Sequence, residues 1–114
     1  MVNRFVIIDR YLDEVASLIE SNKCFLIEME KNKKTILKLG FTKHNVFDEI
    51  KKLSYLNYIS GPERDEDFNL KGLVWKFGKK INELEIYIKI KVVSKGLTCI
   101  SFHEAEYKIN YLFK

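Results

Sequence analysis

Residues 84–93 read LEIYIKIKVV, and their strict alternation of apolar and polar side chains predicts a half-buried β-strand. One face of this strand would be apolar and would pack on a core. The opposite face would carry Glu85, Tyr87, Lys89, Lys91 and Val93. The neighbours of this strand can be placed by testing which pairing register matches apolar to apolar side chains.

The strand before it is predicted at residues 73–81, connected by a two-residue turn at Asn82-Glu83. This register pairs Phe77 with Ile88 on the core side, and Trp75 with Ile90. On the polar side it places Lys76 directly opposite Lys89. Like charges that face each other across a strand pair cost stability, so an anion between the two lysines would explain them.

The strand after it is predicted to follow a three-residue loop, Ser94-Lys95-Gly96, with Gly96 in a left-handed conformation. This register places Ile90 opposite Ile100 in the core and turns Cys99 to the polar face. A two-residue loop would mix the two faces, so the three-residue loop is favoured. On the polar face the register pairs Lys89 with Ser101 and Tyr87 with His103.

The polar face of these three strands is therefore a candidate site, composed of Lys76, Tyr87, Lys89, Lys91, Ser101 and His103. Ammonium groups with tyrosine and serine hydroxyls suit a phosphate. Cleavage of RNA needs a base for the 2′-hydroxyl proton, an acid for the leaving 5′-oxygen and cations for the phosphorane. Histidine suits either proton-transfer role. A non-catalytic binding face, or lysines that merely prevent aggregation, accounts for the same residues.

The N-terminal half is predicted to contain helices. Asp9 is a plausible N-cap for a helix that stops near Asn22, and residues 5–8 are either a short strand or the lead-in to that helix. A brief strand is expected at residues 25–29. Two short helices should follow, at 33–39 with Gly40 as the C′ residue, and after the N-cap Thr42. A turn at residues 60–62 and a polar loop at 63–69 precede the strands.

Composition places the chain among ordinary globular proteins. It has 114 residues, 46% of them hydrophobic, which fits a single domain over 1–114. The net charge of +4 suits a polyanionic partner without requiring one, and the lysines between residues 31 and 43 are by default a solvated helix face. Cys24 and Cys99 form no motif and suit a reducing cytoplasm. No membrane-spanning stretch, cofactor motif or metal-ligand motif is present in the sequence.

Several segments resemble the MqsR family of bacterial toxins. The resemblance rests on VWKF at 74–77, IYIKI at 86–90, CISFH at 99–103, LGFT at 39–42, and residues 53–62 with their Ser-Gly-Pro turn. It covers roughly the last two-thirds of the chain. Members of this family are messenger-RNA interferases with a RelE-like fold, each neutralised by a cognate antitoxin.

The family's active residues transfer to matching positions only. Its strand tyrosine falls on Tyr87 and the following lysine on Lys89. Its glutamine after the strand tryptophan is Lys76 here, and its lysine after Ser-Phe is His103. The lysine expected beside the tyrosine near the turn has no match next to Tyr58, and Arg64 is a possible substitute.

We therefore predict an α+β, RelE-like fold, with N-terminal helices packed on a mainly antiparallel sheet that ends in a three-stranded meander. The expected function is that of a cytoplasmic toxin that cleaves messenger RNA without a metal or other cofactor and is bound by an antitoxin. His103, Tyr87, Lys76 and Lys89 would be catalytic. The alternative is a non-catalytic module that binds nucleic acid or a regulatory protein. Further RNA contacts are expected from Lys91, Ser101, Arg64 and Tyr58.

Overall fold

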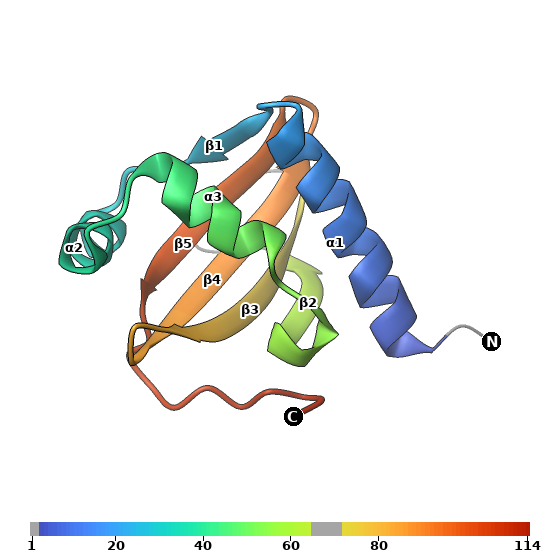
Figure 1. The fold of residues 1–114 in the computed structure, drawn as a ribbon. Helices are drawn as coiled ribbons and strands as arrows, with labels where there is room; N and C mark the ends of the chain where they lie inside the picture. Colours follow the sequence, from blue (N-terminus) through green and yellow to red (C-terminus); the bar gives the residue numbers. More distant parts are fainter. Residues whose placement is uncertain (1–2, 65–71) are drawn as a thin grey trace.

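The computed structural model describes residues 3–64 and 72–114 and shows the predicted α+β architecture. Three helices, α1 (Arg4–Glu20), α2 (Glu30–Leu39) and α3 (Lys43–Lys51), and a short 3₁₀ turn η1 (Tyr55–Asn57) accompany a mixed sheet. The strands are β1 (Cys24–Leu26), β2 (Tyr58–Arg64), β3 (Leu73–Ile81), β4 (Leu84–Val93) and β5 (Gly96–Glu104), in the spatial order β1-β5-β4-β3-β2. Helices α1 and α3 cover one face, while α2 lies beyond β5 (Figure 1).

The β3–β4 hairpin confirms its predicted register residue by residue. Phe77 pairs with Ile88, and Lys76 pairs with Lys89. The turn residues Asn82 and Glu83 have φ values of 47° and 69°. Two consecutive left-handed residues are typical of the tight turn whose twist matches that of a hairpin.

The β4–β5 hairpin was predicted correctly at the site end and wrongly at the turn. Tyr87 pairs with His103 and Lys89 with Ser101, as expected. However, Val93 already pairs with Gly96, and Ile90 pairs with Cys99 instead of Ile100, because the register shifts by one residue after Lys89. The connection is thus a two-residue turn, and a bulge inserts the extra residue within β5.

Gly96 itself lies against a distant part of the chain. Its φ of 136° and its position against the backbone of Lys23 leave no space for a Cβ atom, which would overlap the Lys23 carbonyl oxygen. Gly96 is therefore required by close packing, not by a loop. The register shift in β5 also places Cys99 in the core and not on the polar face, and this burial raises the pKa of its thiol.

The outer edge of β5 is closed in two ways. Strand β1 pairs with it in parallel from Cys24 to Leu26. Beyond that point Asn32 of α2 takes over: its Nδ2 donates to the carbonyl oxygens of Ile100 (2.9 Å) and Ile27 (3.0 Å), and its Oδ1 accepts from the Phe102 N–H (2.9 Å).

Thr35, one turn further along α2, continues the same edge. Its hydroxyl oxygen accepts a hydrogen bond from the Glu104 N–H at 2.9 Å. Side chains of a helix thus occupy the place that a neighbouring strand would take. The backbone on both sides of His103 is therefore held by α2.

The N-terminal helix begins earlier than predicted. Asn3 is its N-cap and residues 5–8 are helical, so the N-cap predicted at Asp9 is wrong. Asp9 lies inside α1, where its Oδ1 accepts a hydrogen bond of 3.0 Å from the Tyr55 N–H. This contact attaches η1 to α1.

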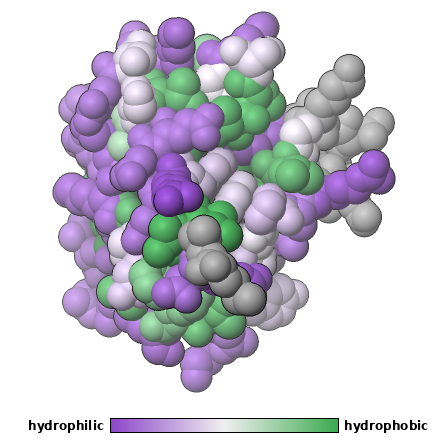
Figure 2. Space-filling model, turned by 90° about the vertical axis from the view of Figure 1, so that its right-hand side faces the viewer, coloured by the Kyte–Doolittle hydropathy of each residue, from purple (hydrophilic) through white to green (hydrophobic). Residues whose placement is uncertain are grey.

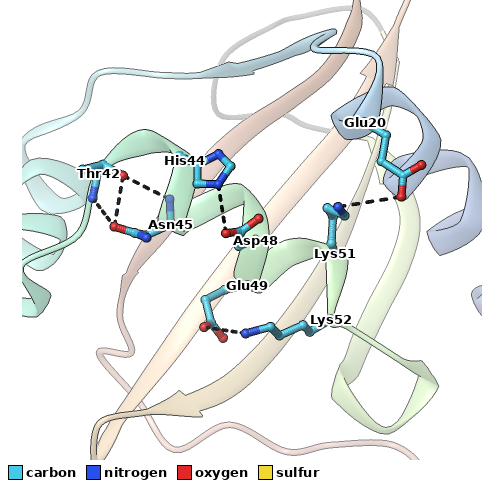
Figure 3. A network of polar contacts seen from close by, with 8 residues as sticks. All are labelled: Glu20, Thr42, His44, Asn45, Asp48, Glu49, Lys51 and Lys52. Atoms are coloured by element: carbon cyan, nitrogen blue, oxygen red, sulfur yellow. Dashed lines mark hydrogen bonds and ion pairs between the residues drawn. The ribbon is translucent and has the colours of Figure 1, made fainter.

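Helix α3 has the predicted N-cap: Thr42 accepts from the Asn45 N–H at 3.2 Å, and its own N–H donates to Asn45 Oδ1 at 2.8 Å (Figure 3). Near the other end of the helix, Lys51 forms an ion pair with Glu20 of α1 at 3.7 Å (Figure 3). The two helices that cover the sheet are thereby linked to each other.

A second ion pair attaches α3 to the sheet. Lys79 of β3 lies 2.7 Å from Glu49, and both side chains are largely buried. Burial alone would raise the pKa of Glu49, but the hydrogen bond and charge of Lys79, with the charge of Lys52, outweigh it, and the pKa is lowered.

The apolar core lies between the sheet and the pair α1 and α3. It includes Ile8, Val46, Phe77, Ile88 and Phe102, each at most 3% exposed. The side of the molecule on which α1 lies shows a largely hydrophilic surface with some hydrophobic patches (Figure 2). The polar face of the meander lies on the other side of the sheet.

The segment predicted as a turn and loop is partly a strand. Residues 58–64 form β2, with two register shifts against β3, and Pro62 is tolerated because this strand is at the edge of the sheet. The rest of the predicted loop, residues 65–69, lies outside the described residues.

Candidate functional site

The polar face of β4 and β5 lines a cavity of about 670 Å³, a size typical of ligand pockets. Four of the predicted site residues lie in its wall: Tyr87, Lys89, Ser101 and His103. They come from two adjacent strands, where Tyr87 faces His103 and Lys89 faces Ser101 across the ladder. The predicted register is thus what brings these side chains together.

His103 has a defined tautomer when it is neutral. Its Nδ1 lies 3.0 Å from the carbonyl oxygen of Glu104, and a carbonyl can only accept a hydrogen bond. Nδ1 therefore carries the hydrogen, and Nε2 has the lone pair that accepts a proton. The ring also contacts Tyr87, with 5.6 Å between the two ring centroids.

Lys89 and Ser101 are nearly enclosed, with only 6% and 5% of their surfaces exposed. An ammonium group at this depth interacts with an anion more strongly than one in bulk water does. Lys76, directly opposite Lys89, forms an ion pair of 2.6 Å with Glu63. It is not among the described residues that line the cavity.

Three residues predicted to contact RNA lie elsewhere. Lys91 is only 2% exposed and is outside the described wall of the cavity. Tyr58 is a core residue, 1% exposed, and its hydroxyl donates to the Gly61 carbonyl at 2.6 Å, so it has no surface to offer to an RNA. Arg64 is exposed at the end of β2, opposite Leu73.

Sequence reasoning missed the second wall of the cavity, which is the segment after β5. Residues 105–110 line it, and the chain then continues past β4 and β3 towards η1 (Figure 1). Tyr111 donates a hydrogen bond of 2.9 Å to Glu85, and the Leu112 N–H donates to the Tyr58 carbonyl at 3.3 Å. Burial, together with Glu85, raises the pKa of the Tyr111 hydroxyl.

One signal of this wall was present in the sequence. Gly78 interrupts an otherwise regular strand pattern, and a glycine there often marks a close approach of another chain segment. In the structure, a Cβ atom on Gly78 would lie 2.7 Å from Ile109 Cδ1. The glycine thus provides the space in which the C-terminal segment lies on β3.

A smaller cavity of about 210 Å³ adjoins the first, and His103 lies in the walls of both. Its other lining residues come from α2 and from the segment after His103. Two ion pairs connect these elements: Lys38 with Glu104 at 3.0 Å, and Lys31 with Glu106.

Among residues 3–64 and 72–114, no group of three or more His, Cys, Asp or Glu side chains is arranged to hold a metal ion. In the same ranges no helix is long and apolar enough to cross a membrane.

A comparison with protein-family models finds a match over residues 9–104. The matching family is described as "Motility quorum-sensing regulator, toxin of MqsA". The match begins within α1, covers α2, α3 and the five described strands, and ends at Glu104, the last residue of β5. Comparisons with curated proteins and with solved structures find no match.

Proposed function

Because the chain belongs to the family of motility quorum-sensing regulators that are toxins of MqsA, it is the toxin of a toxin–antitoxin system, and we propose that it is an endoribonuclease that cleaves messenger RNA without a metal ion. Membership implies a cognate antitoxin as its partner. Messenger RNA as the substrate and the cytoplasm as the place of action are parts of the proposal.

The observation that carries this proposal is the position of His103 in the larger cavity. It is 8% exposed and lies beside Tyr87, and Lys89 and Ser101 come from the same two strands. A proton-transfer group, a hydroxyl donor and a cation thus line the same cavity. These are the parts that cleavage of a phosphodiester by the neighbouring 2′-hydroxyl requires.

In the proposed reaction, the 2′-oxygen of the RNA loses its proton, attacks the phosphorus and displaces the 5′-oxygen, which gains a proton. His103 serves as the acid or the base through Nε2, since its Nδ1 hydrogen is bound to the Glu104 carbonyl. Tyr87 assists the proton transfer, and Lys89 stabilises the charge on the phosphorane. Ser101 adds a hydroxyl contact to a phosphate oxygen.

Lys76 can bind the phosphate in this proposal only if its ion pair with Glu63 is broken. Its ammonium group already has Glu63 as counter-ion at 2.6 Å, so a phosphate must compete with that carboxylate. The position of Lys76 directly opposite Lys89 places both lysines along the same part of the β3–β4 ladder. Arg64 and Lys91 are not brought to the cavity and have no part in the reaction as proposed here.

The test is cleavage of a defined messenger RNA by the purified protein in EDTA. We expect cuts with the wild type and a loss of about 10²- to 10⁴-fold in rate with His103→Ala, the range that a general acid or base contributes. His44→Ala is the matched control, because His44 is an exposed histidine of α3 that pairs with Asp48 at 3.2 Å (Figure 3). Circular dichroism of both variants checks that the fold is retained.

The non-catalytic alternative predicts a different pattern. A module that only binds RNA or a regulatory protein leaves the RNA intact, with and without added ribosomes, and His103→Ala then has no activity to remove. Full cleavage by His103→Ala, with the wild-type pattern of cuts, would overturn the assignment of His103.

A further inference from the structure

Helix α2 carries three lysines on one side. Lys31, Lys34 and Lys38 are spaced three and four residues apart, so they lie along one stripe of the helix. The rotation of the helix is fixed because Asn32 and Thr35 are buried against β5, where they bond to its backbone. The stripe therefore has a defined orientation relative to the sheet.

The stripe faces the site. All three lysines line the smaller cavity, and His103 is in its wall as well. Since His103 also lines the larger cavity, the two spaces meet at the proposed proton-transfer group. A strand of RNA that reacts at His103 and extends from the larger cavity into the smaller one would run beside the lysines of α2.

The wall of the smaller cavity carries a net positive charge. Three lysines face two carboxylates, Glu104 and Glu106, in the wall of the smaller cavity, which leaves one positive charge before any contribution from His103. The carboxylates hold Lys38 and Lys31 in ion pairs. The third lysine, Lys34, thus supplies the excess positive charge.

We propose that Lys31, Lys34 and Lys38 form a track that binds the phosphates of the RNA strand next to the cleaved bond. This inference rests on the proposed ribonuclease function and adds a substrate-binding surface to it. Ammonium groups on long side chains bind phosphates as point charges, without reading the bases. The track binds single-stranded RNA irrespective of its sequence, and it leaves the choice of cleavage sequence to the larger cavity.

The chain offers a matched pair of variants for the test. Lys34→Ala removes a charge from the track, whereas Lys33→Ala removes the same charge from the next residue, which is exposed, pairs with Glu28 at 3.9 Å and is not among the residues described in the cavity wall. Each change is made in the His103→Ala background, so that the RNA stays intact. Binding of a fluorescent, unstructured RNA is then measured over a series of salt concentrations.

We expect Lys34→Ala to weaken binding by about 2- to 5-fold, the range for an exposed charge pair. The slope of log K against log salt should become less steep by about 0.7, the value for one lost phosphate contact on a single strand. Lys33→Ala should change neither quantity. Equal effects of the two variants would show that only net charge matters and would overturn the track.

Failure of the track and failure of the ribonuclease are distinguishable. If the wild type cleaves RNA while Lys34→Ala binds like Lys33→Ala, the track is wrong and the enzyme stands. If the protein with His103→Ala binds no RNA even at low salt, the track is also overturned, and cleavage by the wild type still reports separately on the proposed function.

Discussion

Replacing Asn32 by alanine tests whether α2 holds β5 as the structure indicates. The side chain is 1% exposed and forms three hydrogen bonds, to the Ile100 and Ile27 carbonyls and from the Phe102 N–H. Each bond contributes about 1 kcal/mol to stability, and a buried group left unpaired costs about 1–3 kcal/mol. We therefore expect the free energy of unfolding to fall by about 3–5 kcal/mol.

Thermal and urea unfolding followed by circular dichroism measure this loss. In a domain of this size 1 kcal/mol corresponds to about 4 °C, so the midpoint should fall by about 12 °C or more. Lys33→Ala is the control in the same helix, since its side chain is exposed, and we expect it to change stability by less than about 0.5 kcal/mol. The urea m-value should remain unchanged if the native fold is kept.

A loss of less than about 1 kcal/mol for Asn32→Ala would refute this reasoning, because one net hydrogen bond is worth that much. It would mean that water or a shifted α2 satisfies the backbone of β5 as well as the amide does. A second readout is RNA cleavage at a temperature where the variant is folded. The backbone next to His103 at Phe102 loses its partner, so the rate should fall in Asn32→Ala and not in Lys33→Ala.

Gly96→Ala should destabilise the protein severely, because its Cβ would overlap the Lys23 carbonyl, whereas Gly40→Ala, with a φ of 69° and nothing within 4 Å of the added atom, should cost only about 1–2 kcal/mol. Urea unfolding of the two variants measures the difference, and similar losses would contradict the account of Gly96. Lys79→Met removes the ion pair with Glu49 and should cost about 2 kcal/mol at neutral pH. Because the folded-state pKa of Glu49 is lowered, the wild-type advantage is present above its unfolded pKa, about 4.3, and is lost as the pH falls through the folded value, so unfolding curves of both proteins should converge in acid.

The sequence predicted the β3–β4 hairpin and the pair Tyr87 and His103 because a two-residue period and a tight turn are local signals. It did not predict the bulge in β5. The predicted three-residue loop relied on Gly96, which in the structure lies against the backbone of Lys23, more than seventy residues away in the sequence. A local pattern contains no information about such a contact.

Local sequence patterns were equally insufficient for parts of the candidate site. The alternation of apolar and polar residues predicts Lys91 on the polar face. It does not indicate how deeply a side chain is buried, and Lys91 is almost fully buried. The lysines of α2 are exposed, as a solvated helix face predicts, but the sequence pattern does not show that the packing of Asn32 and Thr35 orients three of them towards the cavity that His103 lines. The wall formed by residues 105–110 has no regular period that would have predicted it.

The position of β5 in the sheet also has a consequence for the order in which the chain can fold. Strand β5 lies between β1 and β4, although β1 is synthesised some seventy residues before it. Until β5 emerges from the ribosome, β1 and α2 have no strand to dock on, and the apolar faces of α1 and α3 lack part of their core. Pairing over such a separation in sequence is slow to form. The same strand carries His103, so the proposed proton-transfer group takes its place opposite Tyr87 only when β5 pairs with β4.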